Sequence, residues 1–173
     1  MQPSEAKTER YPDQTKTVRS GRATPGDGAA MWELADQSTL DSNSPYAYIM
    51  WGDYFGLTSR VAHDETGLIG FVMGFRPPEK PDTLFVWQVG VSPRARKTGL
   101  ASRLIEEIWA ANEGLRFLES TVTPNNAASE RLFRSFAERH KAAVETTVHY
   151  GEELFPVGDH EAEIRFRIGP TDP

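Results

Sequence analysis

The chain has 173 residues, of which 38% are hydrophobic and 25% are charged, values that favour one globular domain with its own core. It contains no cysteine, which excludes disulfides, thiolate metal sites and a cysteine nucleophile. The net charge of −6 disfavours a nucleic-acid partner, because phosphate binding requires a basic face. The histidines lie too far apart in sequence for a local metal motif, so we expect no metal.

The first 16 residues are polar, rich in charge and proline, and contain no apolar run. We expect residues 1–16 to form a flexible tail rather than a signal peptide or membrane anchor, and residues 17–170 to form a single domain. No later segment approaches the roughly 20 apolar residues that a membrane helix requires. The sequence therefore predicts a cytoplasmic protein without a membrane partner.

The predicted elements alternate in a recognisable order. Two helix starts pair a hydroxyl residue with proline, at Thr24-Pro25 and Ser44-Pro45. In chain order we predict a short strand at 17–19, helices beginning at Pro25 and Pro45, strands at 60–63, 68–75 and 83–91, a helix at 99–112, a strand at 117–122, a helix at 126–140, and weaker strands at 146–150 and 164–168. This order predicts an α+β fold, a mixed sheet with helices on both faces.

The most informative stretch follows the strand 83–91. Ser92-Pro93 ends that strand, Arg94, Arg96 and Lys97 follow, and Gly99 begins a helix. A helix N-terminus presents unpaired N–H groups and a partial positive charge, so it binds anions and phosphates in particular. With three basic side chains beside it, this turn predicts a diphosphate site.

The spacing Arg96-x-x-Gly99-x-Ala101 resembles the acyl-CoA diphosphate loop of the GCN5-related N-acetyltransferases (GNAT). The second helix of that family carries Asn-x-x-Ala/Ser-x-x-Leu-Tyr/Phe, which Asn126-x-x-Ser129-x-x-Leu132-Phe133 matches. The resemblance implies the GNAT fold, with a central, mostly antiparallel mixed sheet, and acetyl-CoA as co-substrate. It implies these cofactor-binding residues: Val89, Val91, Arg96, Lys97, Thr98, Gly99, Leu100, Ala101, Asn126 and Ser129.

Two positions depart from the GNAT pattern. Lys97 stands where the family often has glycine, and Phe133 stands where it often has the tyrosine that protonates the leaving CoA thiolate. A thiolate is a fairly good leaving group, since the cysteine thiol has a pKa near 8.5. Another donor, water, or no protein acid at all could therefore serve.

Further segments resemble the L-2,4-diaminobutyrate acetyltransferases of ectoine synthesis. They are Leu40 to Tyr46, Pro81 to Val89, Leu118 to Asn126 and Arg167 to Pro170, and the likeness runs from about Thr17 to Pro170. This resemblance implies acetylation of the γ-amine of diaminobutyrate, a homodimer, and a compatible-solute role in osmotic stress.

Amide formation requires a neutral amine, although an alkylamine with a pKa of about 10.4 is protonated at pH 7. The site must therefore bind an ammonium and accept its proton, which carboxylates can do. We assign a catalytic role to Glu119, because it lies within a predicted central strand, where an unpaired carboxylate is costly. The resemblance implies a role in amine recognition and catalysis for Asp41, in the loop before the helix that begins at Pro45. With the resemblance, the predicted substrate-binding residues are Asp41, Asn43, Tyr46, Trp87, Glu119, Thr121 and His160.

Four of these residues also have an ordinary structural interpretation. Glu119 could be a salt-bridged core residue, Asp41 a turn or capping acid, Trp87 a core residue, and His160 an exposed loop residue. For the whole chain, two other functions stay open. One is acetylation of a different small diamine or amino acid, and the other is a non-catalytic CoA-binding sensor.

Overall fold

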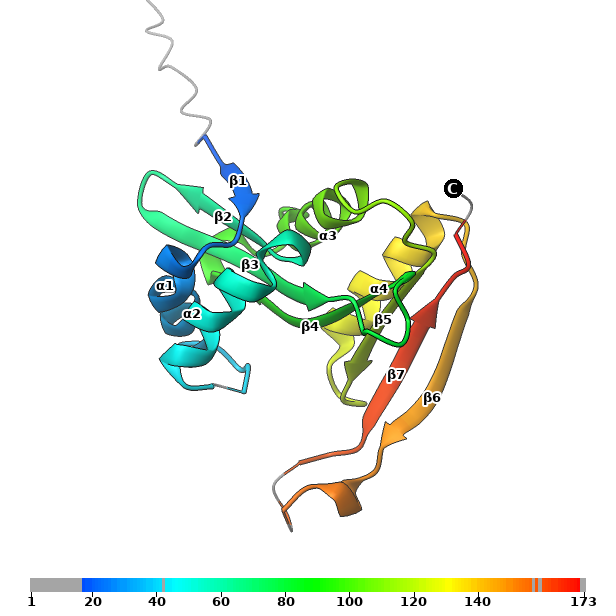
Figure 1. Ribbon diagram of the computed structural model, residues 1–173. Helices are drawn as coiled ribbons and strands as arrows, with labels where there is room; N and C mark the ends of the chain where they lie inside the picture. Colours follow the sequence, from blue (N-terminus) through cyan, green and yellow to red (C-terminus); the bar gives the residue numbers. More distant parts are fainter. Residues whose placement is uncertain (1–16, 42, 157, 159, 172–173) are drawn as a thin grey trace, which may run out of the picture.

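The computed structural model describes residues 17–41, 43–156, 158 and 160–171; the predicted tail, residues 1–16, lies outside the described residues. The elements are β1 (Arg19–Arg22), α1 (Gly28–Asp36), α2 (Pro45–Tyr54), β2 (Arg60–Asp64), β3 (Gly67–Phe75), β4 (Thr83–Val91), α3 (Leu100–Ala110), β5 (Phe117–Val122), α4 (Ala127–Arg139), β6 (Val144–Tyr150) and β7 (Glu163–Ile168). Figure 1 shows their arrangement around one central sheet.

The sheet has seven strands in the order β1-β2-β3-β4-β5-β7-β6. Strands β4 and β5 are parallel, and the other neighbouring pairs among the described strands are antiparallel. Helix α3 connects β4 to β5, as a parallel pair requires a crossover. The predicted α+β fold with a mostly antiparallel mixed sheet is confirmed.

Two apolar clusters cover the two faces of the sheet. One joins α3 and α4 to the strands through buried side chains such as Leu104, Ile108, Leu118 and Phe136. The other joins α1 and α2 to β2 and β3 through Met31, Tyr48, Trp51, Val61 and Phe71. Figure 1 shows α1 and α2 on one side of β3 and β4, and α3 and α4 on the other. Helices on both faces are therefore confirmed as well.

Strands β4 and β5 pair over a short distance only. Their parallel ladder joins Thr83, Leu84 and Phe85 to Phe117, Leu118 and Glu119, and no further pair between them occurs among the described residues. Beyond this point β4 keeps β3 as its partner, and β5 keeps β7. The last part of β4, Val86 to Val91, thus has a strand edge turned away from β3 that β5 does not occupy.

A β-bulge lies within this part of β4. Gln88 pairs with Met73 and Val86 pairs with Gly74, so Trp87 is the extra residue. A bulge bends a strand and redirects the side chain beside it. Here it interrupts the ladder close to where β4 and β5 part.

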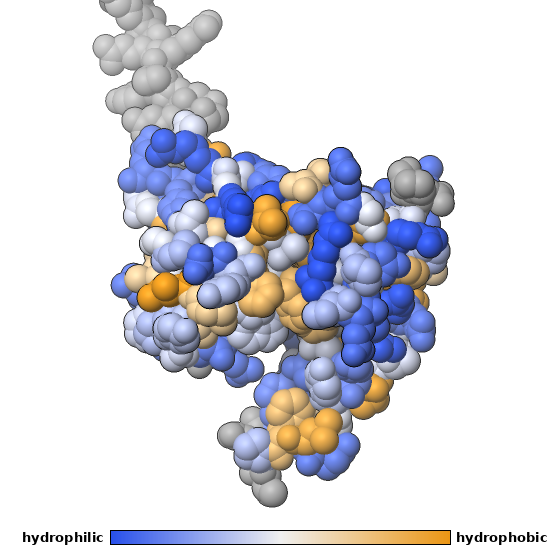
Figure 2. Space-filling view, viewed as in Figure 1, coloured by the Kyte–Doolittle hydropathy of each residue, from blue (hydrophilic) through white to orange (hydrophobic). Residues whose placement is uncertain are grey.

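The β6–β7 hairpin projects from the body of the molecule (Figure 1). Strand β6 is an edge strand, and its side chains are mostly exposed. A patch of apolar atoms gathers on the projecting arm (Figure 2), where Val148 is 68% and Leu154 is 66% exposed. Water therefore contacts an apolar surface at this end of the molecule.

The predicted boundaries agree with the structure within a few residues, with one displacement. The first strand begins at Arg19 rather than residue 17, because Arg19–Arg22 pairs with His63–Arg60 of β2. In α4, Phe133 and Phe136 are buried as predicted, whereas Ser129 and Leu132 are half-buried.

The position of α2 depends on a close approach at Gly52. A Cβ atom at Gly52 would lie 2.3 Å from the Thr24 carbonyl oxygen, whereas one at Gly26 would have its nearest neighbour at 3.6 Å. We expect Gly52→Ala to lower the free energy of unfolding by about 1–3 kcal/mol. The melting temperature should fall by several degrees, and Gly26→Ala should leave it nearly unchanged. Equal melting curves for the two variants would show that α2 can shift without cost.

Candidate active site

The turn between β4 and α3 has the backbone conformation of an anion-binding nest. Lys97 has a φ of 61° and Gly99 a φ of 81°, both left-handed, and Gly99 is the N-cap of α3. Such turns direct successive N–H groups toward one point, and the helix N-terminus adds its partial positive charge. The left-handed φ of Lys97 also gives the physical reason why glycine is common at this position in GNAT proteins.

The basic residues of the turn have different surroundings. Arg96 is exposed, and its Nε donates to the Val91 carbonyl at 3.4 Å. Arg94 instead contacts the β2–β3 hairpin, where its Nη2 lies 3.3 Å from Asp64 Oδ1 and its Nη1 donates to Thr66. The positive charge of Arg94 is therefore partly compensated by Asp64. Arg96 and Lys97 are both exposed, so we expect these two residues to provide more of the free positive charge of the turn.

The second predicted cofactor motif lies at the start of α4. Asn126 is the N-cap of this helix, and its Oδ1 accepts a hydrogen bond from the Ser129 backbone N–H at 3.1 Å. The predicted backbone contacts at Val89 and Val91 belong to the part of β4 that has parted from β5. An extended group could add to this strand edge through backbone hydrogen bonds.

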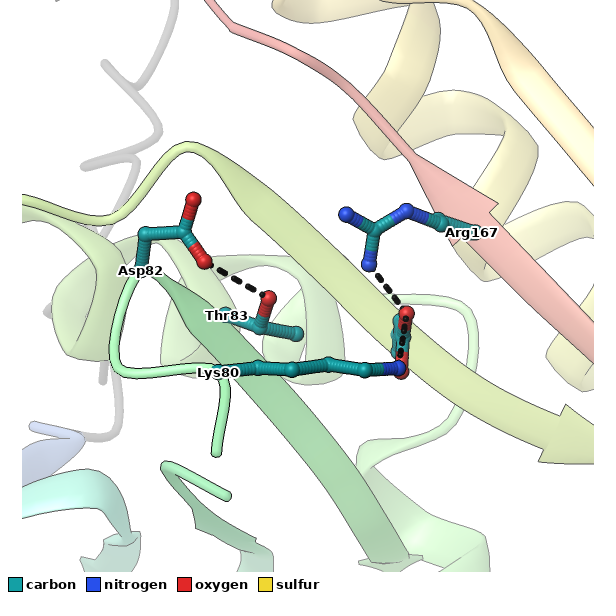
Figure 3. Close-up of polar contacts among 5 residues, drawn as sticks. Lys80, Asp82, Thr83 and Arg167 are labelled. Carbon is teal, nitrogen blue, oxygen red and sulfur yellow. Dashed lines mark hydrogen bonds and ion pairs between the residues drawn. The ribbon is translucent and has the colours of Figure 1, made fainter. Parts of the chain in front are cut away.

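Glu119 is 5% exposed in its side chain and contacts two cations. Lys80 Nζ donates to its two oxygens at 3.3 and 3.4 Å, and Arg167 Nη1 donates to Oε1. Figure 3 shows Lys80 reaching across from the loop before β4 and Arg167 descending from β7 toward the same carboxylate. Glu119 also lies on the sheet face predicted for it, opposite the buried Leu118 and Val122.

These contacts keep Glu119 ionised. Burial alone would raise the pKa of the Glu119 carboxyl, but hydrogen bonds and charge from Arg167 and Lys80 outweigh burial and hold the pKa below its ordinary value of 4.5. The carboxylate is therefore negative at neutral pH. It can attract an ammonium group, and Lys80 can withdraw because its side chain is 45% exposed.

Asp41 lies in the loop between α1 and α2, and its side chain is 87% exposed. The loop is tied to the bulged region of β4, because Gln88 Nε2 donates to the Asp41 carbonyl at 2.9 Å and Tyr48 donates to Gln88 Oε1 at 3.0 Å. Asp41 Oδ2 lies 3.5 Å from His160 Nε2. The structure thus brings together two predicted residues that are distant in sequence.

His160 belongs to the segment between β6 and β7. Its ring stacks on Phe155 at 4.2 Å, and Nε2 also lies 3.6 Å from Glu163 Oε1. The hydrogen bond with the Glu161 carbonyl raises the pKa of His160 above its ordinary value, and nearby Glu163 and Asp41 act in the same direction. A protonated His160 links the α1–α2 loop to β7 by charge.

The other predicted substrate-binding residues surround the same region. Trp87 is partly exposed and stacks on Trp51 at 4.6 Å between ring centroids. Thr121 pairs with Arg165 of β7, two residues beyond Glu119. Tyr46 is exposed in the first turn of α2, and Asn43 Nδ2 makes a long contact of 3.5 Å with the Asp41 carbonyl.

Sequence reasoning missed several polar residues that complete this site. They are Lys80, Gln88, Glu163, Arg165 and Arg167. A signal for three of them was present, since charged residues at alternate positions 163, 165 and 167 share one face of a strand. Lys80 and Gln88 gave no such signal, because only the folded chain brings them to Glu119 and Asp41.

Within the part of the chain that the structure describes, no group of three His, Asp or Glu side chains could hold a metal ion. None of the described helices is long and apolar enough to cross a membrane.

The sequence profile of the Acetyltransferase (GNAT) family matches residues 28–137, which include the nest and the N-cap of α4. The chain is a member of the GNAT family. The acetyltransferase fold recurs at low identity, as in the ribosomal-protein-S18-alanine N-acetyltransferase from Escherichia coli, with a TM-score of 0.67 at 15% identity over 91% of this chain and 96% of that one. The expected family, fold and enzyme class are confirmed, and the interpretation as a non-catalytic sensor loses its support.

More similar acetyltransferases share one name. L-2,4-diaminobutyric acid acetyltransferase from Halalkalibacterium halodurans is 48% identical over 91% of this chain and 84% of its own length. The enzyme of that name from Marinococcus halophilus is also 48% identical, over 86% of this chain and 88% of its own. The solved structure of diaminobutyrate acetyltransferase EctA from Paenibacillus lautus, in complex with L-2,4-diaminobutyric acid and coenzyme A, has a TM-score of 0.87 at 42% identity over 91% of this chain and 98% of that one.

Because Arg96 is exposed and lies in the turn next to Lys97 and Gly99, we expect Arg96→Ala to weaken CoA binding about tenfold through loss of charge-assisted hydrogen bonds. Isothermal titration calorimetry with CoA and with pantetheine, which lacks the diphosphate, measures the effect. Pantetheine affinity should hold, and the control Arg94→Ala should affect CoA less because Arg94 pairs with Asp64. Equal losses for CoA and pantetheine would remove Arg96 from the diphosphate site.

The lowered pKa of Glu119 links stability to pH. A carboxylate with a depressed folded-state pKa stabilises the protein above its unfolded-state pKa, and this stabilisation is lost as pH falls through the folded-state value. Glu119→Gln should therefore lower the free energy of unfolding at pH 7 by about 1–3 kcal/mol. Urea denaturation should show the gap between variant and wild type shrinking below about pH 4.5. A gap that stays constant from pH 7 to pH 3 would contradict the ion-paired carboxylate.

Proposed function

We propose that this acetyltransferase transfers the acetyl group of acetyl-CoA to the γ-amine of L-2,4-diaminobutyrate, as a step in ectoine synthesis. The observation that carries the proposal is the open edge of β4. This edge runs from Phe85, which pairs with Glu119 of β5, to the nest at the start of α3. The near-complete overlap with an enzyme solved with diaminobutyric acid and coenzyme A supports the choice of both substrates.

On the donor side, the CoA diphosphate would bind the nest at Lys97 and Gly99, with Arg96 adding charge. The pantetheine arm would then extend along β4 at Val89 and Val91, within reach of Asn126 at the start of α4. This course brings the thioester to the bulge at Trp87, where the ladder is interrupted. A backbone N–H of β4 there would stabilise the oxyanion that develops on the carbonyl.

On the acceptor side, the amine arrives as an ammonium and must lose a proton before it attacks. Glu119 is ionised and would bind this ammonium as Lys80 withdraws. Because its pKa is low, Glu119 is a weak base and does not retain a proton at neutral pH. We therefore propose that the ammonium proton moves by way of the Glu119 carboxylate to water. Asp41, held by Gln88 and His160, would contribute a second negative charge beside the same region.

We propose direct attack of the amine on the thioester in a ternary complex, since no cysteine is available to form an acyl-enzyme. Phe133, at the position of the common tyrosine acid, is buried at 2% exposure and packs against Phe166. The thiolate would therefore leave without a proton from this position, which its moderate basicity permits.

We further propose that residues 17–170 act as one domain in a cytoplasmic homodimer. The apolar patch on the β6–β7 hairpin and the exposed edge of β6 support dimerisation, because a partner subunit would remove both from water. Acetyl-CoA is a cytoplasmic metabolite, which supports that location. A monomer mass in analytical ultracentrifugation at micromolar concentration would contradict the dimer.

The central experiment is identification of the product formed from acetyl-CoA and L-2,4-diaminobutyrate. Mass spectrometry should show one added acetyl group, and NMR should locate it on the γ-nitrogen. Thiol release by Glu119→Gln should be about 100-fold slower, with CoA affinity unchanged as the control for folding. No product from diaminobutyrate, or a higher kcat/KM for putrescine or lysine, would reject the proposed substrate.

A further inference from the structure

Two buried polar atoms lack a hydrogen-bond partner among the described residues, Glu163 Oε2 and Arg165 Nε. Leaving a buried donor or acceptor unpaired costs about 1–3 kcal/mol, so such atoms are rare in native proteins and call for an explanation. Here the two atoms belong to neighbouring side chains of one strand and carry opposite charge.

Both residues lie on the sheet face that bears Glu119. Arg165 pairs with Thr121 and Arg167 with Glu119, and directly paired residues share a face. Phe166 and Ile168, which alternate with them, belong to the core beneath α3 and α4. Glu163 and Arg165 therefore follow Glu119 and Arg167 along the open face of the sheet, toward His160.

The two side chains have not neutralised each other. Residues i and i+2 of a strand are about 7 Å apart along the chain, and no ion pair joins Glu163 to Arg165 among the described residues, where Glu163 Oε1 faces His160 instead. An internal salt bridge would have been the simplest way to satisfy both groups. Its absence leaves one positive and one negative group side by side, each with an unused hydrogen-bonding atom.

We propose that Arg165 and Glu163 bind the α-carboxylate and α-ammonium of an amino-acid substrate. The inference rests on the proposed function and adds the residues that hold the end of the substrate that does not react. A guanidinium matches the geometry of a carboxylate, and a carboxylate oxygen accepts from an ammonium. The zwitterionic head of an α-amino acid carries these two groups on a single carbon.

This placement also gives a physical reason for selectivity between two amines. With the head bound at Glu163 and Arg165, the α-ammonium stays charged and hydrogen-bonded, so it cannot attack. The side chain would point along the face toward Glu119, which receives the second amine. Glu163 and Arg165 thus select which nitrogen is acetylated without touching it.

Truncated substrates separate the two contacts. 1,3-Diaminopropane lacks the carboxylate of diaminobutyrate, and 4-aminobutyrate lacks its α-amine. We expect Arg165→Gln to lower kcat/KM for diaminobutyrate and 4-aminobutyrate by about 10- to 100-fold and to change 1,3-diaminopropane by less than twofold. Glu163→Gln should lower kcat/KM for diaminobutyrate, spare 4-aminobutyrate, and yield a measurable fraction of α-acetylated product by NMR.

Where a truncated amine is not turned over, its inhibition constant against diaminobutyrate replaces kcat/KM. Calorimetric CoA affinity and melting temperature monitor folding, and Arg165→Lys should recover part of the carboxylate contact. Arg139→Gln, which breaks an exposed ion pair with Glu106 at the end of α4, is the matched control and should leave every substrate unaffected.

Equal losses for all three amines, or no loss for any, would overturn the proposed zwitterion site. In both cases wild-type activity on diaminobutyrate would still uphold the proposed function. Absence of that activity in the wild type would reject the proposed function itself.

Discussion

The parting of β4 from β5 is the constraint on which the rest of the site depends. A parallel ladder that continued past Phe85 and Glu119 would bury the edge of β4 and leave no room for a pantetheine arm beside it. Because the ladder stops there, each strand needs another way to remain in the sheet. Strand β4 relies on β3 and the apolar cluster of α3, and β5 relies on β7. Helix α3 then begins at the far end of the exposed edge, so the strand edge and the helix N-terminus lie in line for the elongated coenzyme that we propose binds there.

The charges on the open face follow from the same arrangement. Strand β7 replaces β4 as the partner of β5, and it brings Arg167 beside Glu119. A carboxylate in a central strand could not remain ionised without such a partner. The loop before β4 adds Lys80, whose side chain is 45% exposed against 25% for Arg167, so Lys80 is the more easily displaced of the two cations. One cation is thus built into the sheet, and the other is exchangeable.

The sequence predicted the local elements of the fold well, because their signals are local. Pro25 and Pro45 follow capping residues, and the apolar pattern of β4 and β5 matches their burial. The motif from Arg96 to Ala101 likewise predicted that a helix begins at Gly99, which is the N-cap of α3, although the left-handed conformation of Lys97 could not be read from residue type. The pairing of Arg94 with Asp64 could not be predicted, because Asp64 belongs to a hairpin about 30 residues earlier. The contacts of Asp41 with Gln88 and His160 depend on tertiary packing and were beyond prediction from spacing.

Lys97 has a consequence for how an acidic protein captures an anionic coenzyme. A left-handed conformation costs a residue with a Cβ atom about 1–2 kcal/mol, which glycine would avoid. In return, Lys97 places an exposed positive charge beside the nest, in a protein whose net charge is −6. The long-range field of the molecule repels CoA, so encounter depends on this local reversal of potential. Rising ionic strength screens the distant repulsion as well as the local attraction. Binding of the coenzyme should therefore depend less on salt concentration than it would on a uniformly basic surface.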